Sequence, residues 1–117
     1  MSIRNVLTSS IYCSFIALLF IAITYLAIMP SNVPVVDQAN DKFKHILAFA
    51  VLAWGLSRYW SWPWRRVAGV LLAYGIGIEI VQAFVPGRYS SGLDVLADCV
   101  GIAVGVGASR LLVRRAV

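Results

Sequence analysis

No charged residue occurs between Arg4 and Asp37, and this run constrains the fold more than any other feature of the sequence. Its apolar core at 6–29 is longer than the roughly 7–15 apolar residues of a signal peptide, and no A-x-A cleavage site follows it. A helix needs about 20 apolar residues to cross a bilayer. We therefore expect a retained transmembrane helix at 6–29.

The rest of the chain is also too apolar for a soluble domain. Of its 117 residues, 61% are hydrophobic and 13% are charged, whereas soluble domains carry about 25% charged residues. Proline-containing polar stretches interrupt the apolar segments, and proline ends helices. They predict further helices at about 41–60, 67–85 and 93–113. The expected fold is all-α, an integral membrane four-helix bundle forming a single domain over residues 1–117.

Charge indicates the orientation of this bundle, because Lys and Arg are enriched in cytoplasmic segments. With four helices, one side carries arginines and no acid: Arg4, Arg58, Arg65, Arg66, Arg110, Arg114 and Arg115. We therefore expect both termini to be cytoplasmic and the protein to be multi-pass. The net charge of +5 predicts no nucleic-acid partner, because the basic residues form no continuous patch.

Small residues spaced four apart predict close packing of the last two helices, because they let helix backbones approach each other in lipid. The third helix carries Gly69, Ala73 and Gly77 at this spacing. The fourth carries Gly101, Gly105 and Ser109. We expect both stripes to face neighbouring helices.

Glu79 is the most informative polar residue, because it lies within an otherwise apolar helical segment. At 1.5 Å per residue it lies about 9–10 Å from the outer end of the predicted helix. A charge at that depth is costly, so Glu79 is expected to face the bundle interior or a polar cavity. Gln82 extends the same polar face, and Gly75 leaves room beside it. Glu79 either serves a function or forms an interhelical hydrogen bond that fixes packing.

Asp94 and Asp98 lie four residues apart and share one face of the fourth helix. Ser91 and Asp94 fit a capping box, with Ser91 as the N-cap. Asp98 is one turn deeper, cannot be explained as a cap, and needs a partner. Arg88 is the one arginine on the outer side. It could pair with these acids, hold a phosphate or carboxylate, or meet lipid phosphates.

The second helix begins with Asp41 and Lys42, and His45 follows one turn inside, at the depth expected for Asp98. Asp41 either caps the helix or joins a site. His45 with Glu79, Asp94 and Asp98 could offer one nitrogen and several oxygens to a metal ion. No closely spaced metal-ligand motif is present, however, so neither a metal ion nor another cofactor is expected. The expected binding residues are Asp41, Lys42, His45, Glu79, Gln82, Arg88, Ser91, Asp94 and Asp98.

These motifs resemble the VanZ-like family. The resemblance covers about 41–105 and rests on Asp41-Lys42-x-x-His45, Glu79-x-x-Gln82, Pro86-Gly87-Arg88-x-x-Ser91-x-x-Asp94 and Gly101. The family usually has asparagine where this chain has Asp98, which adds a charge near Glu79. The resemblance implies a protein of the bacterial inner membrane. The family takes its name from a protein associated with resistance to teicoplanin, and the resemblance implies no particular reaction.

Three classes of function follow as hypotheses. The leading one is a protein that binds or shields a cell-envelope lipid headgroup or lipid-linked precursor at the outer leaflet, with an effect on teicoplanin susceptibility. Its partners would be membrane lipids, such a precursor or a lipoglycopeptide. The second is an intramembrane hydrolase or transferase that uses Glu79, Asp94 and His45. The third is a small structural or transport-related membrane protein, for which a homo-oligomer could supply the polar path that one protomer lacks.

Overall fold

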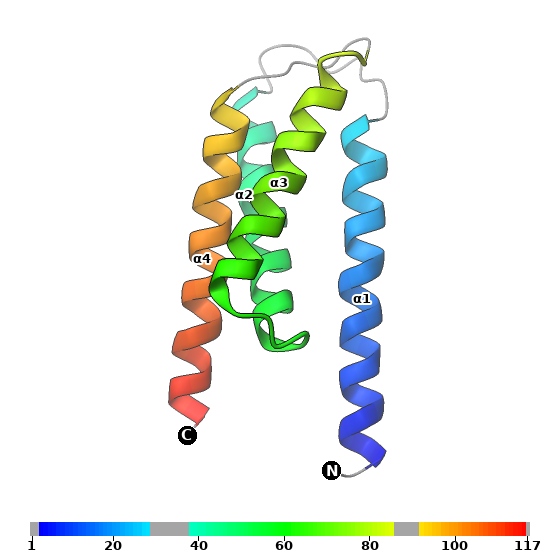
Figure 1. Ribbon diagram of the computed structural model, residues 1–117, viewed down its shortest axis with the longest axis vertical. Coiled ribbons are helices and arrows are strands. Elements are labelled where there is room, and N and C mark those ends of the chain that lie inside the picture. The colour runs from blue at the N-terminus through cyan, green and yellow to red at the C-terminus, as the bar shows by residue number, and fades with distance from the viewer. Residues whose placement is uncertain (1–2, 29–37, 86–91, 117) are drawn as a thin grey trace.

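The computed structural model describes residues 3–28, 38–85 and 92–116, and within these ranges the regular secondary structure is entirely helical. Figure 1 shows the four helices: α1 (Ile3–Ile28), α2 (Gln38–Arg58), α3 (Trp64–Gln82) and α4 (Gly92–Ala116). The expected all-α fold with four helices is therefore confirmed. Helix α3 begins earlier than expected, directly after Pro63, which is its N-cap. A proline suits this position because its missing N–H would have no helical partner there.

The first and last helices are the most suited to cross a bilayer. Among the described residues, Val6–Ile28 in α1 and Gly92–Leu111 in α4 are long and apolar enough to do so. Helix α1 also exposes large apolar side chains: Leu18, Ile21 and Tyr25 are each more than 60% exposed. Large contiguous apolar surfaces are rare on soluble monomers. The surface of α1 therefore suits an apolar environment.

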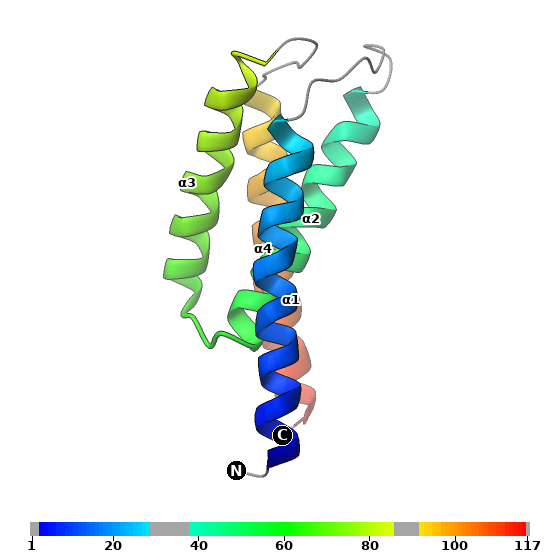
Figure 2. The same ribbon diagram turned by 90° about the vertical axis from the view of Figure 1, so that its right-hand side faces the viewer.

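The helices form an elongated bundle in which α2 and α4 make the most extensive contact. Helix α3 packs against both, while α1 contacts α2 and α3. Figures 1 and 2 show that the start of α1, the connection from α2 to α3 and the end of α4 lie at the same end of the bundle. We call this the arginine end, after Arg58, Arg65, Arg66 and Arg110. The helix ends near Lys42 and Asp94 lie at the opposite end.

Two glycines of α4 bring this helix close to α2, as the small-residue spacing predicts. A Cβ atom on Gly101 would lie 2.5 Å from the carbonyl oxygen of Ile46 and 3.1 Å from the backbone nitrogen of Ala50. A Cβ atom on Gly105 would collide with the carbonyl oxygen of Ala50. Backbone-to-backbone packing of this kind leaves no space for any larger residue.

The corresponding prediction for α3 is wrong. Gly69, Ala73 and Gly77 are exposed, and a Cβ atom on either glycine would have no neighbour within 4 Å. The buried face of α3 instead carries Val67, Leu71, Gly75, Ile78, Glu79 and Gln82. At about 100° per residue, the small-residue stripe lies on the side of α3 opposite this buried face. The stripe of small residues therefore does not attach α3 to the bundle.

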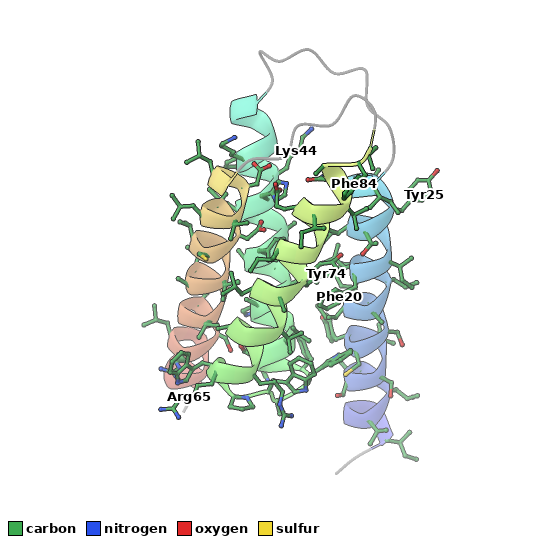
Figure 3. All side chains as sticks on the ribbon, turned by 45° about the horizontal axis from the view of Figure 1, so that its top comes forward. Phe20, Tyr25, Lys44, Arg65, Tyr74 and Phe84 are labelled. Atoms are coloured by element: carbon green, nitrogen blue, oxygen red, sulfur yellow. The ribbon has the colours of Figure 1, made fainter. Side chains whose placement is uncertain are left out.

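The core lies between the helices on the arginine side of the buried acids. Its largest fully buried apolar side chains come from three helices: Ile16, Phe49, Leu52, Leu56, Val67 and Leu71. Between α1 and α3, the rings of Phe20 and Tyr74 pack edge to face with centroids 5.1 Å apart, and Figure 3 shows both pointing into this interface. The Tyr74 hydroxyl also donates to the carbonyl oxygen of Phe20 at 3.1 Å.

Candidate functional site

Polar side chains from three helices meet at the end of the bundle opposite the arginines. We call them the polar cluster: Lys42 and His45 from α2, Glu79 from α3, and Asp94 and Asp98 from α4. The three carboxylates are almost completely buried, with 7% of Glu79, 2% of Asp94 and none of Asp98 exposed. Burial of so many ionisable groups is costly unless they are paired, so these residues depend on one another.

His45 and Asp98 form the most closely paired contact of the polar cluster. His45 Nδ1 and Asp98 Oδ1 are 2.8 Å apart, the distance of a charge-assisted hydrogen bond. The imidazole also stacks on Phe49, with the two rings nearly parallel and their centroids 6.4 Å apart. These contacts fix the orientation of the ring. The partner that Asp98 requires is thus His45, which lies at the same depth in the bundle, as the sequence predicts.

Gly75 provides the space for Asp98. A Cβ atom on Gly75 would lie 2.5 Å from Asp98 Oδ2 and 3.3 Å from its Cγ. The sequence suggested that this glycine leaves room beside Glu79, its neighbour on the same helix. The structure shows that the room is taken by a carboxylate from α4, because Gly75 faces that helix.

Glu79, Asp94 and His45 converge although they belong to three different helices. Each offers one nitrogen or oxygen atom, and these three atoms lie within 4.8 Å of one another. Lys42 Nζ is 3.5 Å from Asp94 Oδ1, an ion pair longer than a hydrogen bond. Within the described part of the site, three buried carboxylates thus lie near one lysine, Lys42, and one imidazole. Their oxygens can accept hydrogen bonds from a ligand or bind a cation.

Gln82 is directed to a different contact. Its Nε2 donates to the carbonyl oxygen of Ala27 at 2.9 Å, which joins α3 to the end of α1. Gln82 is 3% exposed, and its Oε1 receives no hydrogen bond from the described residues. The structure thus gives Gln82 a packing contact beside the polar cluster.

Three expected site residues cannot be placed in the site. Arg88 and Ser91 lie outside the described residues, and with them the proposed capping box. Asp41 lies in the first turns of α2, but its side chain is also outside the described part of the chain. The polar cluster accounts for the remaining expected residues apart from Gln82.

Comparison with known protein families gives one match. The model of the VanZ/LLP1 family matches residues 6–113, which include most of every helix. The chain belongs to the VanZ/LLP1 family. The resemblance drawn from the polar motifs is therefore confirmed. Searches of curated proteins and of solved structures gave no match.

The polar contacts between α1 and α3 of this VanZ chain were missed in the sequence. Thr24 donates its hydroxyl proton to the carbonyl oxygen of Phe20 at 2.8 Å, so the single Tyr74 hydroxyl proton is shared between that carbonyl oxygen and the Thr24 hydroxyl oxygen close beside it. Single hydroxyls in apolar helices are common and form no sequence motif. Only the packing of α1 against α3 shows that these two hydroxyls meet. Tyr74 precedes Gly75, and Figure 3 shows it directed toward α1.

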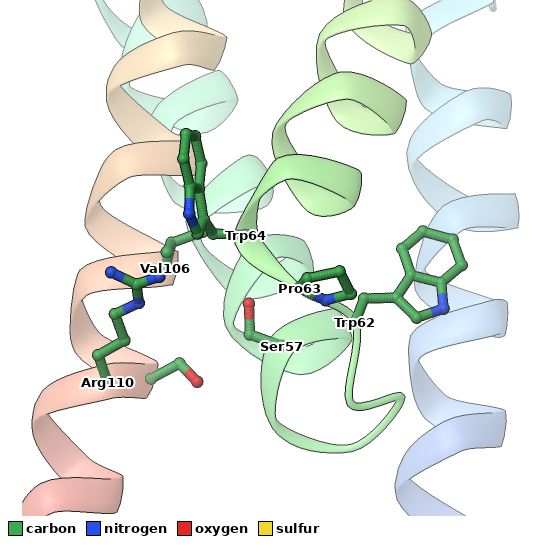
Figure 4. A pocket seen from close by; sticks show the side chains of 7 residues that line it. Ser57, Trp62, Pro63, Trp64, Val106 and Arg110 are labelled. Carbon is green, nitrogen blue, oxygen red and sulfur yellow. The ribbon is translucent and has the colours of Figure 1, made fainter.

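A second feature of the VanZ chain is a pocket of about 210 Å³ at the arginine end. Its lining, shown in Figure 4, comes from the connection between α2 and α3 and from α4: Ser57, Trp62, Pro63, Trp64, Val106, Ser109 and Arg110. The guanidinium groups of Arg65 and Arg66 also lie over nearby tryptophan rings. Tryptophan and arginine are typical of membrane interfaces, so this pocket has the composition of a lipid-contacting surface.

The polar cluster can support two kinds of chemistry. Its carboxylates can accept hydrogen bonds from hydroxyl or ammonium groups or bind a cation. Its His45–Asp98 pair can also move a proton, because a carboxylate that orients an imidazole is a common acid–base arrangement. Both depend on side chains that the fold gathers from separate helices.

Proposed function

We propose that this VanZ chain is a multi-pass protein of the bacterial inner membrane that binds the headgroup of an envelope lipid or lipid-linked wall precursor. The observation that carries the proposal is the buried polar cluster at the end of the bundle opposite the arginines. The positive-inside rule favours a cytoplasmic arginine end and cytoplasmic termini. The polar cluster then lies at the outer leaflet, where headgroups of such lipids are found.

The apolar surface supports the membrane location. Helices α1 and α4 each contain a segment suited to cross a bilayer, and α1 is covered with exposed large apolar side chains. In water these surfaces would be unfavourable, since each Å² of apolar area costs roughly 25 cal/mol to hydrate. In a bilayer the same surfaces contact lipid tails.

The charge of the polar cluster favours a particular class of headgroup. Glu79, Asp94 and Asp98 provide acceptor oxygens, while Lys42 supplies a fixed positive charge. Sugar hydroxyls and ammonium groups donate hydrogen bonds to carboxylates, whereas a bare phosphate would be repelled by them. We therefore favour a headgroup with hydroxyl or amino groups, such as the glycan of a lipid-linked precursor.

A change in teicoplanin susceptibility fits this proposal. Teicoplanin carries a fatty acyl chain, so it would meet such a protein at the membrane. Deletion and restoration of the gene should then change and recover glycopeptide susceptibility. Unchanged susceptibility in both strains would remove this part of the proposal.

Native mass spectrometry of gently purified protein tests headgroup binding. We expect one specific lipid or precursor to co-purify with the unaltered chain and to be lost from Glu79→Gln and Asp94→Asn. Lys44→Gln is the matched control, because Lys44 lies near His45 in α2 but is exposed. Helical circular dichroism and size-exclusion profiles verify folding. The proposal would be contradicted if only bulk phospholipid co-purified and neither substitution changed the amount bound.

A second candidate function is hydrolysis or transfer of a lipid-linked group, favoured by the 2.8 Å contact between His45 and Asp98. In this function Glu79 or Asp94 acts as general base and His45 as acid or as the orienting group. Glu79→Gln should abolish turnover of the co-purifying lipid and leave its binding largely intact. Loss of binding without any turnover in the unaltered protein would favour the first function over this one.

A further inference from the structure

We propose that His45, Glu79 and Asp94 form a binding site for one divalent transition-metal ion, with Zn²⁺ as the best match. The sequence alone argues against a metal site, because these residues show none of the close spacings of known ligand motifs. The three ligands come instead from α2, α3 and α4, and only the packing of these helices brings them together.

The geometry is close to what such an ion requires. The three donor atoms lie within 4.8 Å of one another, whereas the ligands of a tetrahedral Zn²⁺ site, with bonds of about 2.0–2.2 Å, are about 3.3 Å apart. The donor atoms must therefore move closer together by roughly an ångström or more to complete the site. Side-chain rotations provide a movement of this size. Imidazole nitrogen and carboxylate oxygen are both ligands that Zn²⁺ takes in proteins.

Asp98 provides independent support as the orienting group for His45. Metal-bound histidines almost always donate their other ring N–H to a carboxylate, carbonyl or water. Asp98 Oδ1 lies 2.8 Å from His45 Nδ1, so in this site the ion would bind His45 through Nε2. Asp98 is completely buried, and its Oδ2 receives no hydrogen bond from the described residues. A buried carboxylate with such an incomplete shell is stabilised by positive charge on the imidazole or on an ion bound to it.

The charges around the site also favour a cation. Asp94 Oδ1 accepts no hydrogen bond within the described part of the chain, and its nearest cation there is Lys42 at 3.5 Å. Like charges buried together are unfavourable, so three carboxylates gain from a divalent ion. Lys42 partly fills this role and can withdraw toward solvent when an ion binds, because its side chain is 28% exposed.

The ion site stands independently of the proposed lipid binding and also extends it. Three protein ligands leave the fourth position of a tetrahedral zinc ion open to water or to an outside ligand. A headgroup oxygen could occupy that position from the outer leaflet. Metal binding is therefore tested in lipid-free detergent, so that its outcome is separate from that of lipid binding.

The test is a titration of the full chain, stripped of metal by a chelator and purified without a histidine tag. Free thiols also bind zinc, so Cys13 and Cys99 are first replaced by alanine. Calorimetry with Zn²⁺ should give one ion per chain, and Co²⁺ should give the visible absorption bands of a tetrahedral site. Mg²⁺ and Ca²⁺ should bind more weakly, because they prefer oxygen ligands to imidazole.

Substitutions then assign the ligands. We expect Glu79→Gln and His45→Gln to lower Zn²⁺ affinity by at least about 100-fold, and Asp98→Asn by about 10–100-fold. Lys42→Gln should leave affinity unchanged or raise it, because it removes the competing cation, and Lys44→Gln is the neutral control. If His45→Gln does not fold, Asp94→Asn replaces it.

Two results would overturn the proposal. One is the absence of stoichiometric Zn²⁺ binding by the folded cysteine-free chain, and the other is an affinity that Glu79→Gln leaves unchanged. Native mass spectrometry of the same preparations separates the two proposals. Lipid retention without metal binding would reject the ion site alone, and metal binding without a specific lipid would reject the headgroup proposal alone.

Discussion

Gly75 shows how a missing side chain positions a charge. Asp98 reaches His45 because Gly75 leaves space for its carboxylate, with Oδ2 at 2.5 Å from where a Cβ atom would stand. Neither residue could be enlarged without moving the other. At this scale the site depends on the shape of the backbone as much as on the charged groups.

We expect Gly75→Ala to displace Asp98 and weaken its bond to His45. Overpacking of this kind lowers the free energy of unfolding by about 1–3 kcal/mol, measurable by denaturant unfolding in detergent with circular dichroism. Gly77→Ala is the matched control, because a Cβ atom there meets nothing within 4 Å. It should leave stability unchanged or raise it by up to about 1 kcal/mol, since alanine favours helix. Equal destabilisation by both variants would contradict the assigned role of Gly75.

Tyr74 is the second residue with a testable contact. Tyr74→Phe removes the hydroxyl that joins Thr24 and the carbonyl oxygen of Phe20 in α1. The loss of one net hydrogen bond should reduce the free energy of unfolding by about 0.5–1.5 kcal/mol. Tyr25→Phe serves as the control because Tyr25 is 63% exposed. Identical unfolding curves for the two variants would show that the contact contributes nothing to stability.

At the scale of helices, the contact between α2 and α4 holds the site together. His45 lies on α2 and its partner Asp98 on α4, so the separation of these helices sets the 2.8 Å distance. Gly101 and Gly105 permit that separation, because their backbones touch the backbone of α2. Any change that pushes the helices apart should therefore affect the site as well as stability.

Gly105→Ala should push α4 away from α2. Its Cβ atom would collide with the carbonyl oxygen of Ala50, which cannot move as a side chain can. We expect the free energy of unfolding to fall by about 3 kcal/mol, which is at the upper end of overpacking costs. We also expect the variant to retain its ligand less well. Gly107→Ala, with no neighbour within 4 Å, should be nearly neutral. Unfolding midpoints measured in detergent decide between these outcomes. If Gly105→Ala unfolds at the same midpoint as the unaltered chain, the backbones of α2 and α4 are not in contact at Gly105.

At the scale of the whole molecule, charge is separated along the bundle. The described arginine side chains lie at one end, and the buried acids lie toward the other. Such separation sets the orientation of a membrane protein, because basic segments are retained in the cytoplasm. The orientation in turn decides which leaflet the polar cluster faces.

Reporter fusions in bacteria test this orientation. A green fluorescent protein fused after Val117 should fluoresce, since it folds in the cytoplasm. Alkaline phosphatase fused after residue 36, between α1 and α2, should be active, because that segment is expected outside. The reverse pattern would place the polar cluster at the inner leaflet and contradict the proposed headgroup site.

The sequence by itself determined the number and type of the helices, the family and the sorting of charge. These properties depend on local composition: apolar runs, prolines and the polar motifs can be read one segment at a time. The depth of His45 and Asp98 followed from the same reasoning, because depth along a helix depends only on the residue count.

Only the tertiary structure decided which side chains meet. The contact of His45 with Asp98, the space at Gly75 and the convergence of Glu79 with Asp94 depend on how each helix is rotated about its axis. In α3, the small-residue stripe and the buried face were both plausible inward faces, and packing against α2 and α4 selected the second. Rotation is fixed by the sum of many contacts between helices, which no single segment of sequence contains.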